Sequence, residues 1–302
     1  MDTVYHFIAN PQARRGKIMD ELRAVREAFR QAEKTAKFYF TEHPRHAIEI
    51  ADNLTRSGAE IILSCGGDGT AFEVINGIMR SGRASSVRLG IIPLGTGNSF
   101  MRDFGVSSWR ESIERIFNER TIKADIGRIT PAGGENPSCV YFHNMAAFGT
   151  FAEACKLRHG GFRIMGKHAY NAAFLYLLTH LKLYPIQLAF DGASPLELHG
   201  PIVAVCNSQF TGHDIRLSPS SRVDDGRFEA IYVEDAPASD LFKLFLKHPS
   251  GQHLNHPKIT VVSASRIDIH IGEIDCHMVD GELFSNRPLR IDCLPQALEI
   301  FA

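Results

Sequence analysis

The first 125 residues alternate between short apolar strands and one-faced helices. The run "VYHFIA", residues 4–9, predicts a buried strand, and Ile18, Leu22, Val25 and Phe29 follow it at helical spacing. The same order then recurs, with strands predicted at 37–41, 60–65 and 88–92 and helices around 47–54, 75–79 and 113–117. An alternation of this kind is typical of a layered α/β domain.

Beyond Asp125 the pattern changes to short β-rich segments separated by Pro, Gly, Asp or Asn. Apolar spacing predicts helices at about 167–183 and 238–247, and the other segments are predicted strands: "PIVAVCN", "RFEAIYVE", "KITVVS", "RIDIHI", "PLRIDC" and "ALEIF". We therefore predict an α/β domain over residues 1–127 and an antiparallel β-sandwich domain, with one or two helices, over residues 128–302. The last strand, about 295–302, is a candidate to pack back on the first domain.

Composition narrows the choice of function. The 302 residues carry 33 Lys and Arg against 34 Asp and Glu, so no overall charge attracts nucleic acid. The six cysteines form no C-x-x-C pair, as expected of reduced core residues. No apolar signal core or membrane-spanning run occurs, so we expect a cytoplasmic protein without a transmembrane segment. Transient contact with a membrane surface and assembly as a homodimer are both compatible with the sequence.

Two glycine-rich turns follow predicted strands. The segment "GGDGT", residues 66–70, encloses Asp68 between glycines, and "PLGTGNSF" occupies residues 93–100. Glycine allows consecutive N–H groups to turn toward one concave spot that suits phosphate. A carboxylate beside phosphate is useful where a divalent cation or a transferred proton lies between them. Neither turn has the Walker or the dinucleotide-binding spacing, so the sequence predicts a phosphate site of another kind.

These motifs carry a resemblance that covers most of the chain. The segments "GGDGTAFEVINGI" and "PLGTGNSFMRDFG" are similar to those of the diacylglycerol kinase catalytic family, which includes soluble bacterial lipid kinases and sphingosine kinases. The segments "NPQARRGK", "TEHPRHAIEIA", "DIG", "DDGRFEAIYV" and "VDGE" extend the resemblance in the same order. GGDGT is shared with NAD kinases, whereas the P-x-G-T-G-N turn is more specific to lipid kinases.

The resemblance implies a nucleotide cleft between the two domains, with ATP and Mg²⁺ as cofactors. Carried over by position, the nucleotide-binding residues are Asn10, Thr41, Gly66, Gly67, Gly69, Thr70, Glu73, Gly95, Thr96, Gly97 and Asn98. Asp68 matches the acid that organises magnesium near the phosphates and is expected to act in catalysis, and Asp125 is an acid expected nearby that is also predicted to bind the metal. Asp280 in "VDGE" matches the general base, with Glu282 close by.

Two acidic motifs each have a second interpretation. Asp224 or Asp225, in "DDG", matches acids that hold a structural magnesium in soluble bacterial relatives. Both "DDG" and "VDGE" also fit a plain β-turn, because Asp-Gly is common in hairpin turns. On sequence alone the catalytic role of Asp280 rests on its place after the two glycine turns.

The chain departs from the family pattern at two positions. Ser99 stands where an acid is often found, and it cannot supply charge to a magnesium network. Arg14 stands where glycine is usual, while Arg15 and Lys17 fit either phosphate contact or an ordinary solvated helix start.

The apolar helix at about 167–183 fits either plain core packing or contact with lipid, and Arg163 and Lys167 beside it fit either anionic headgroups or a solvated surface.

The resulting expectation is an ATP- and Mg²⁺-dependent lipid kinase that acts at a membrane surface on diacylglycerol or a related lipid alcohol. An NAD kinase-like enzyme and a non-catalytic nucleotide- or lipid-binding sensor are the two alternatives. Retention of both Asp68 and Asp280 favours an enzyme over the sensor.

Overall fold

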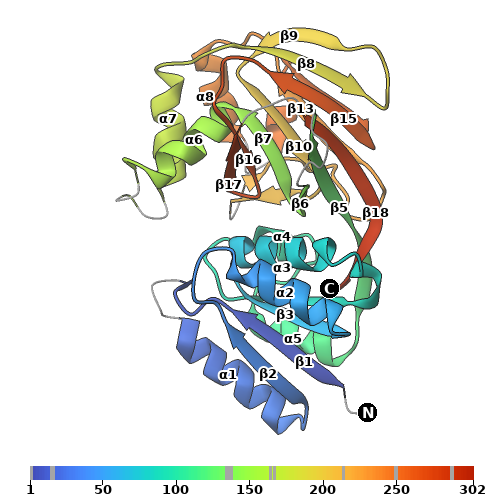
Figure 1. The fold of residues 1–302 in the computed structure, drawn as a ribbon. Helices are drawn as coiled ribbons and strands as arrows, with labels where there is room; N and C mark the ends of the chain where they lie inside the picture. Colours follow the sequence, from blue (N-terminus) through green and yellow to red (C-terminus); the bar gives the residue numbers. More distant parts are fainter. Residues whose placement is uncertain are drawn as a thin grey trace. The chain divides into compact units, whose positions relative to one another are not determined.

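The chain divides into two compact units, which a computed structural model describes over residues 3–13, 18–132, 139–162, 165, 168–212, 215–247, 251–285 and 289–302. Unit 1 comprises Met1–Ile126 and Leu294–Ala302, and unit 2 comprises Gly127–Cys293. The chain passes between the units within two strands, β5 (Thr121–Pro131) and β18 (Leu289–Phe301) (Figure 1).

Unit 1 is a parallel sheet covered by helices. Its strands are β1 (Val4–Ala9), β2 (Thr35–Phe40), β3 (Ile61–Gly66) and β4 (Arg88–Pro93), in the order β2-β1-β3-β4, and the end of β18 pairs with β4 in parallel. Its helices are α1 (Ile18–Gln31), α2 (His46–Arg56), α3 (Asp68–Arg80), α4 (Ser99–Arg102) and α5 (Trp109–Phe117), with a short 3₁₀ turn at Ala84–Ser86.

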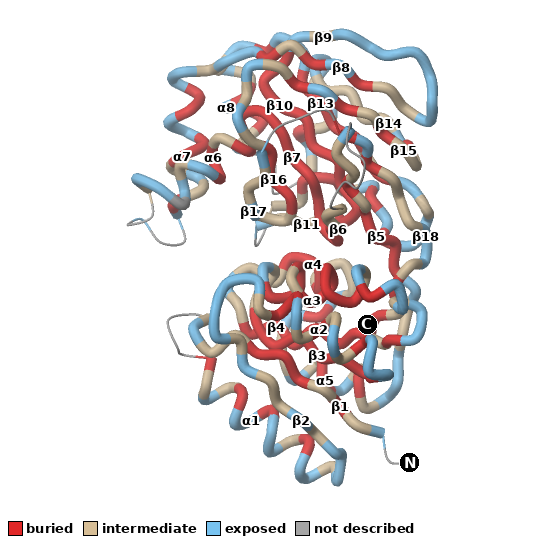
Figure 2. Tube along the Cα trace, viewed as in Figure 1, coloured by how far each residue is buried: buried red, intermediate tan, exposed pale blue. Residues whose placement is uncertain are grey.

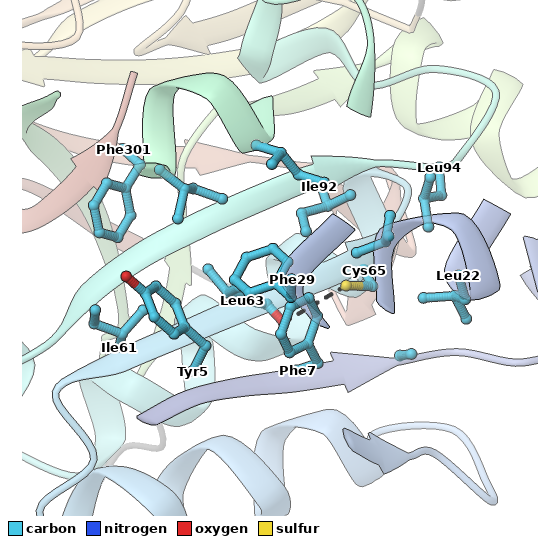
Figure 3. Close-up of a cluster of buried hydrophobic side chains, with 14 of the residues drawn as sticks. Tyr5, Phe7, Leu22, Phe29, Ile61, Leu63, Cys65, Ile92, Leu94 and Phe301 are labelled. Carbon is cyan, nitrogen blue, oxygen red and sulfur yellow. Dashed lines mark hydrogen bonds between the residues drawn. The ribbon is translucent and has the colours of Figure 1, made fainter. Parts of the chain in front are cut away.

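The core of unit 1 forms because alternate strand residues face opposite sides of the sheet. Tyr5 and Phe7 of β1 and Leu63 of β3 pack against the apolar face of α1. Figure 3 shows Phe29 of α1 and Phe301 of β18 within the same cluster. In α1 the buried residues are those predicted by spacing, Ile18, Leu22, Val25 and Phe29, while the opposite face is exposed (Figure 2).

Unit 2 consists mainly of antiparallel strands. One sheet has the order β14-β13-β10-β7-β16-β17, a second joins β18, β15, β8 and β9, and β5 pairs with β6. The strands are β6 (Val140–Phe142), β7 (Met145–Gly149), β8 (Tyr184–Phe190), β9 (Leu196–Gly200), β10 (Ile202–Cys206), β11 (Phe210–Thr211), β12 (Ile215–Arg216), β13 (Phe228–Val233), β14 (Ile259–Ala264), β15 (Arg266–Ile271), β16 (Cys276–Val279) and β17 (Glu282–Ser285). The helices are α6 (Thr150–His159), α7 (Ala169–Leu178) and α8 (Ala238–Lys247), and a 3₁₀ turn spans Gln252–Asn255.

The predicted fold class, an α/β domain followed by an antiparallel β domain, is confirmed. Three element predictions were wrong. Helix α6 was not expected, because its buried residues are the small Ala152, Ala154 and Cys155, which give a weak apolar pattern. The helix predicted at about 167–183 is shorter and spans Ala169–Leu178, after which the chain turns at Thr179 and His180 before β8 begins at Tyr184.

The third wrong prediction concerns β18, which is one strand where "PLRIDC" and "ALEIF" predicted two. Pro295 lies within it, and the next residue, Gln296, has a φ of 50°. The proline suggested that the strand would end there, but the strand continues through this irregular step.

No helix within the described ranges is long and apolar enough to cross a bilayer.

Asp191 follows β8 and links the β8–β9 hairpin to the turn between β14 and β15. Its Oδ1 accepts hydrogen bonds from the N–H groups of Ser265 and Arg266 and from the Ser265 hydroxyl, and Oδ2 pairs with Arg227. Desolvation alone raises the pKa of the Asp191 carboxyl, but these hydrogen bonds and the charge of Arg227 outweigh it, so the pKa lies below its usual value.

We expect Asp191→Asn to lower the unfolding free energy by about 1 kcal/mol at neutral pH, because neutral hydrogen bonds replace charge-assisted ones. A carboxyl with a depressed folded-state pKa stabilises above its unfolded pKa, and this stabilisation is lost as the pH falls through the folded pKa. The difference between variant and wild type should therefore be complete at neutral pH and should disappear in acid, once the pH lies below the lowered folded-state pKa. Thermal unfolding at neutral pH and across the acid range measures it, and a difference that stays undiminished in acid would contradict the assignment.

Candidate active site

The ends of four parallel strands place the predicted nucleotide-binding residues along one edge of the unit 1 sheet. Ala9 of β1 stands level with Phe40 of β2 and Cys65 of β3, and Gly66 stands level with Pro93 of β4. The residues that follow these strand ends include Asn10, Thr41, Gly67 and Gly95. Main-chain bonds fix this alignment, since the N–H of Thr41 donates to Ala9 and those of Leu94 and Gly95 donate to Gly66. This edge is where parallel sheets bind ligands.

The two glycine turns are packed directly against each other. A side chain at Gly95 would overlap the Cα of Gly67, and its Cβ would lie 2.9 Å from the Gly67 nitrogen. A Cβ at Gly97 would lie 2.6 Å from Asp68 Oδ2, and one at Gly66 would overlap the Thr70 side chain. None of these glycines has a positive φ. Close approach, and not a left-handed backbone, therefore explains why glycine is needed at these positions.

Asn98 closes the second turn. It has a φ of 54°, which asparagine tolerates, and its side-chain amide both accepts from the N–H of Gly95, at 3.2 Å, and donates to its carbonyl, at 3.0 Å. Thr96, at the tip of this turn, and Gly69, in the first turn of α3, are exposed. Two predicted residues are thus solvent-facing parts of the turns.

Asp68 joins the two turns through its carboxylate. Its Oδ1 accepts the N–H of Ser99 at 2.8 Å, and its Oδ2 accepts the Ser99 hydroxyl at 3.2 Å. Ser99 occupies the position where the family often has an acid, and its role in the structure is to hold Asp68. Asp68 therefore supplies the negative charge between the turns, and the hydrogen bonds from Ser99 fix the orientation of its carboxylate.

Glu73 and Asp125 each bind main-chain N–H groups. Glu73, on α3, accepts the N–H groups of Arg45 and Ala47 at the start of α2. Asp125, on β5, is fully buried and accepts the N–H of Gln296 at 2.7 Å, at the irregular step of β18. Both carboxylates thereby support backbone that has no regular partner at those points.

The four acids predicted to bind metal belong to no group of three or more potential ligands within the described residues. Asp224 pairs with Arg222 and Asp225 accepts the N–H of Arg227, both on the exposed turn before β13. One group of three occurs among the described residues, formed by His43, His46 and Glu49. Nδ1 of His46 accepts the N–H of Glu42, so Nε2 carries the ring hydrogen of the neutral imidazole and is not free to bind metal.

Asp280 lies in the two-residue turn of the β16–β17 hairpin, in which Val279 faces Glu282. Asp280 and Gly281 have φ values of 48° and 91°, the type I′ geometry that Asp-Gly favours. The plain-turn interpretation of "VDGE" is thus confirmed for the backbone. Glu282 is exposed at the start of β17.

The Asp280 side chain, in contrast, is fully buried in unit 2 among groups that the sequence did not reveal. Its carboxylate accepts the N–H groups of His143, Asn144 and Met145, and Nδ1 of His143 lies 2.8 Å from Oδ2. Asn207 then bonds the His143 carbonyl. The available signal for these residues was a polar pair, His143 and Asn144, between two apolar strands.

Two sets of sequence-predicted residues lie outside the described ranges. They are Arg14, Arg15 and Lys17 before α1, and Arg163 and Lys167 before α7. Chemically, the described part of unit 1 offers a row of strand ends, two interlocked turns and one carboxylate between them. Such an arrangement suits a phosphate group together with the cation that balances its charge.

Both halves of the chain match known protein families. The model of the diacylglycerol kinase catalytic domain matches residues 4–129, and that of the YegS C-terminal NAD kinase beta sandwich-like domain matches residues 144–302. A diacylglycerol kinase from Staphylococcus epidermidis is 30% identical over 274 residues, which cover 87% of this chain and 80% of the relative.

Solved structures share the fold. A candidate diacylglycerol kinase from Bacillus anthracis superposes with a TM-score of 0.77 at 23% identity, covering 99% of this chain and 96% of the other. An NAD kinase from Archaeoglobus fulgidus, in complex with ATP, gives a TM-score of 0.52 at 12% identity, covering 99% and 93%. At these identities the likeness concerns the fold.

Proposed function

Because the chain belongs to the diacylglycerol kinase family, we propose that it transfers the γ-phosphate of ATP to the hydroxyl group of a lipid alcohol, diacylglycerol or a close relative, with Mg²⁺ as the metal. The observation that carries this proposal is the interlock of the two glycine turns around Asp68 at the carboxyl edge of β3 and β4. Phosphoryl transfer depends mainly on positioning and on neutralising phosphate charge, and backbone N–H groups in tight turns serve the first need.

The residues present fit a divalent cation beside the phosphates. Asp68 provides carboxylate oxygens, the hard ligands that Mg²⁺ prefers. The absent side chain at Gly97 keeps open the space next to Asp68 Oδ2, which a Cβ would fill. When bound, Mg²⁺ supplies neutralisation of the negative charge on the phosphate oxygens. The chain itself contributes orientation, because Ser99 holds the carboxylate in one direction before nucleotide arrives.

An assay with labelled ATP, Mg²⁺ and a panel of acceptors tests the function. We expect label in diacylglycerol or in another lipid with a free hydroxyl. Label in NAD alone would select the NAD kinase-like alternative, and ATP binding without label in any acceptor would select the sensor. Omission of Mg²⁺ should abolish transfer to the lipid.

We also propose that unit 2 contacts the lipid surface through exposed apolar side chains of α7 and α8. The two helices pack together through Phe174 and Phe245, whose rings are 5.3 Å apart, yet Tyr176 of α7 and Phe242 and Leu246 of α8 are 48%, 46% and 63% exposed. Residues 154–190, which include α7, carry five Lys and Arg and no Asp or Glu. An exposed apolar side chain within a basic segment, as at Tyr176, suits an anionic membrane surface, and Phe242 and Leu246 add exposed apolar side chains from the adjoining α8.

We expect the double variant Phe242→Glu and Leu246→Glu to bind anionic vesicles about tenfold or more weakly, because each lost insertion removes about 1 kcal/mol or more. Activity on diacylglycerol in such vesicles should fall accordingly. Activity on a short-chain, water-soluble diacylglycerol should stay near that of the wild type. Vesicle sedimentation and both assays measure these effects.

Phe40→Glu is the matched control, since Phe40 is 44% exposed on the edge strand β2 of unit 1. It places the same charge on an equally exposed phenylalanine outside α7 and α8. Equal loss of vesicle binding in the control and in the double variant would contradict the assignment of the membrane-contacting surface.

A further inference from the structure

Strand β2 forms one edge of the sheet in unit 1, and one side of its main chain has no partner. In a strand the N–H and C=O groups of successive residues point to opposite sides. The N–H of Thr41 donates to Ala9 of β1, so the odd-numbered residues of β2 point toward β1. The main-chain groups of Ala36, Phe38 and Phe40 therefore point away from the sheet, and they form no hydrogen bond within the described residues.

This edge has little of the protection that usually keeps edge strands apart. Its sequence contains one charged residue, Lys37, and no proline, and all six residues pair in register with β1, which excludes a bulge. Phe40 is 44% exposed, and Phe38 is only partly buried against the core. The strand at the opposite end of the sheet, β9, is different, because the His199 carbonyl accepts the N–H of Asp235. An apolar edge such as that of β2 is suited to pair with another strand.

A second copy of β2 completes the edge in one register. When two copies run antiparallel about a two-fold axis at Phe38, Phe38 stands opposite its counterpart, and Ala36 stands opposite Phe40 of the other copy. All three outward-facing residues then lie in hydrogen-bonded pairs, with about six main-chain bonds in total. Lys37 stands opposite Tyr39, so its charge meets an aromatic ring and not a second lysine. A shift by one residue sets outward-facing groups opposite inward-facing ones, and a shift by two leaves Ala36 or Phe40 without a partner.

The side chains fit the same register. The exposed ring of Phe40 comes beside the small Ala36 of the other copy, which leaves room for it. Just outside the strand, Lys34 comes opposite Glu42 on both sides of the axis. Both side chains are exposed, and neither forms an ion pair within the described part of the chain. A two-fold interface requires a surface that complements itself, and this pattern of opposite charges favours a second copy over an unrelated partner.

We propose that the chain forms a homodimer in which β2 pairs antiparallel with β2 of a second copy, so that the sheet of unit 1 continues from one copy into the other. The inference goes beyond the proposed kinase function and does not depend on it. It concerns the described residues of unit 1 alone.

Charge reversal at the two ends of β2 tests the register. Lys34→Glu and Glu42→Lys each bring like charges together at both ends of the interface, and we expect the dissociation constant of the dimer to rise about tenfold or more in each. The double variant restores opposite charges and should return to within about threefold of the wild type. Lys123→Glu, on an exposed lysine of β5, is the control and should leave the constant unchanged. Sedimentation velocity of the full chain at about 1–100 µM measures these constants.

Ala36→Pro removes the pairing without adding a charge. The Ala36 N–H points away from the sheet, so proline deletes no hydrogen bond within one copy. We expect a monomer with the circular dichroism spectrum of the wild type, and a dimer as tight as that of the wild type would overturn the proposal. Phe40→Glu also weakens this contact, so its vesicle binding is compared at protein concentrations at which the wild type is monomeric.

Hydrogen exchange resolved by residue identifies the edge that pairs. We expect the amides of Ala36, Phe38 and Phe40 to exchange about tenfold or more slowly at protein concentrations that favour the dimer. The amides of Lys37 and Tyr39 point toward β1 and serve as the internal control, because their exchange should not depend on concentration. A wild type that stays monomeric at about 100 µM would leave this edge to another partner and overturn the proposal. A dimer that neither charge reversal weakens, or one without slower exchange at the three outward-facing amides, would overturn it equally.

Discussion

Asp68→Asn is expected to reduce lipid phosphorylation by about 10³-fold, because stabilisation of transferring phosphate by a metal and its ligand amounts to several kcal/mol and each 1.4 kcal/mol is a factor of ten. The fold should survive the change. Asparagine keeps an oxygen that accepts the Ser99 N–H, and its amide nitrogen is able to donate to the Ser99 hydroxyl. Initial rates and thermal unfolding measure these two consequences.

A matched control removes the same charge elsewhere in unit 1. Asp20 is 87% exposed on α1 and pairs only locally with Arg23 in the described structure, so Asp20→Asn should leave the rate within twofold. We expect Asp68→Asn to bind ATP without Mg²⁺ nearly as well as the wild type and to lose the gain that Mg²⁺ confers. If Asp68→Asn kept more than about a tenth of the activity, the carboxylate would not be part of the catalytic arrangement.

Gly95→Ala is expected to disrupt both glycine turns at once. The added Cβ would lie 2.9 Å from the Gly67 nitrogen and 2.9 Å from Asn98 Oδ1, and it would overlap the Gly67 Cα. Main chain cannot yield as a flexible side chain does, so the turns must separate. Overpacking of this kind costs about 1–3 kcal/mol in stability, and a shift of about 1 Å in a positioned group costs about 10²-fold in rate. ATP titration, kcat/KM and thermal unfolding report the result.

Gly161→Ala adds the same methyl group where nothing lies within 4 Å of the new Cβ and where φ is not positive. It should leave ATP binding and activity unchanged within error. The comparison isolates the effect of contact between the turns from the general effect of replacing glycine by alanine. Wild-type ATP affinity in Gly95→Ala would show that the interlocked turns do not bind the nucleotide.

Local patterns in the sequence were sufficient for most elements of the fold. The stripe of Ile18, Leu22, Val25 and Phe29 predicted α1, and "VYHFIA" predicted β1, because helix and strand periodicity depend only on near neighbours in the chain. The same reasoning failed for α6, where buried alanines carry little signal.

The sequence predicted only part of the candidate site. The motifs placed Asp68 and the glycines together by strand order, yet the sequence offered backbone flexibility as the reason for glycine, and the structure gives close packing of one turn on the other. In the sequence Ser99 indicated only that an acid is missing, whereas in the structure its hydrogen bonds hold the Asp68 carboxylate. His143 and Asn144 were not predicted at all.

What the sequence determined by itself was the order of most elements, the family and the chemical types at the strand ends, because each depends on residues close together in the chain. The tertiary structure alone decided which groups meet. Asp280 encounters the main chain of His143–Met145 only because β16 pairs with β7 in one particular register. That register is set by the burial of whole strands, so neither "VDGE" nor "FHNM" contains the information that the carboxylate is surrounded by four nitrogen atoms.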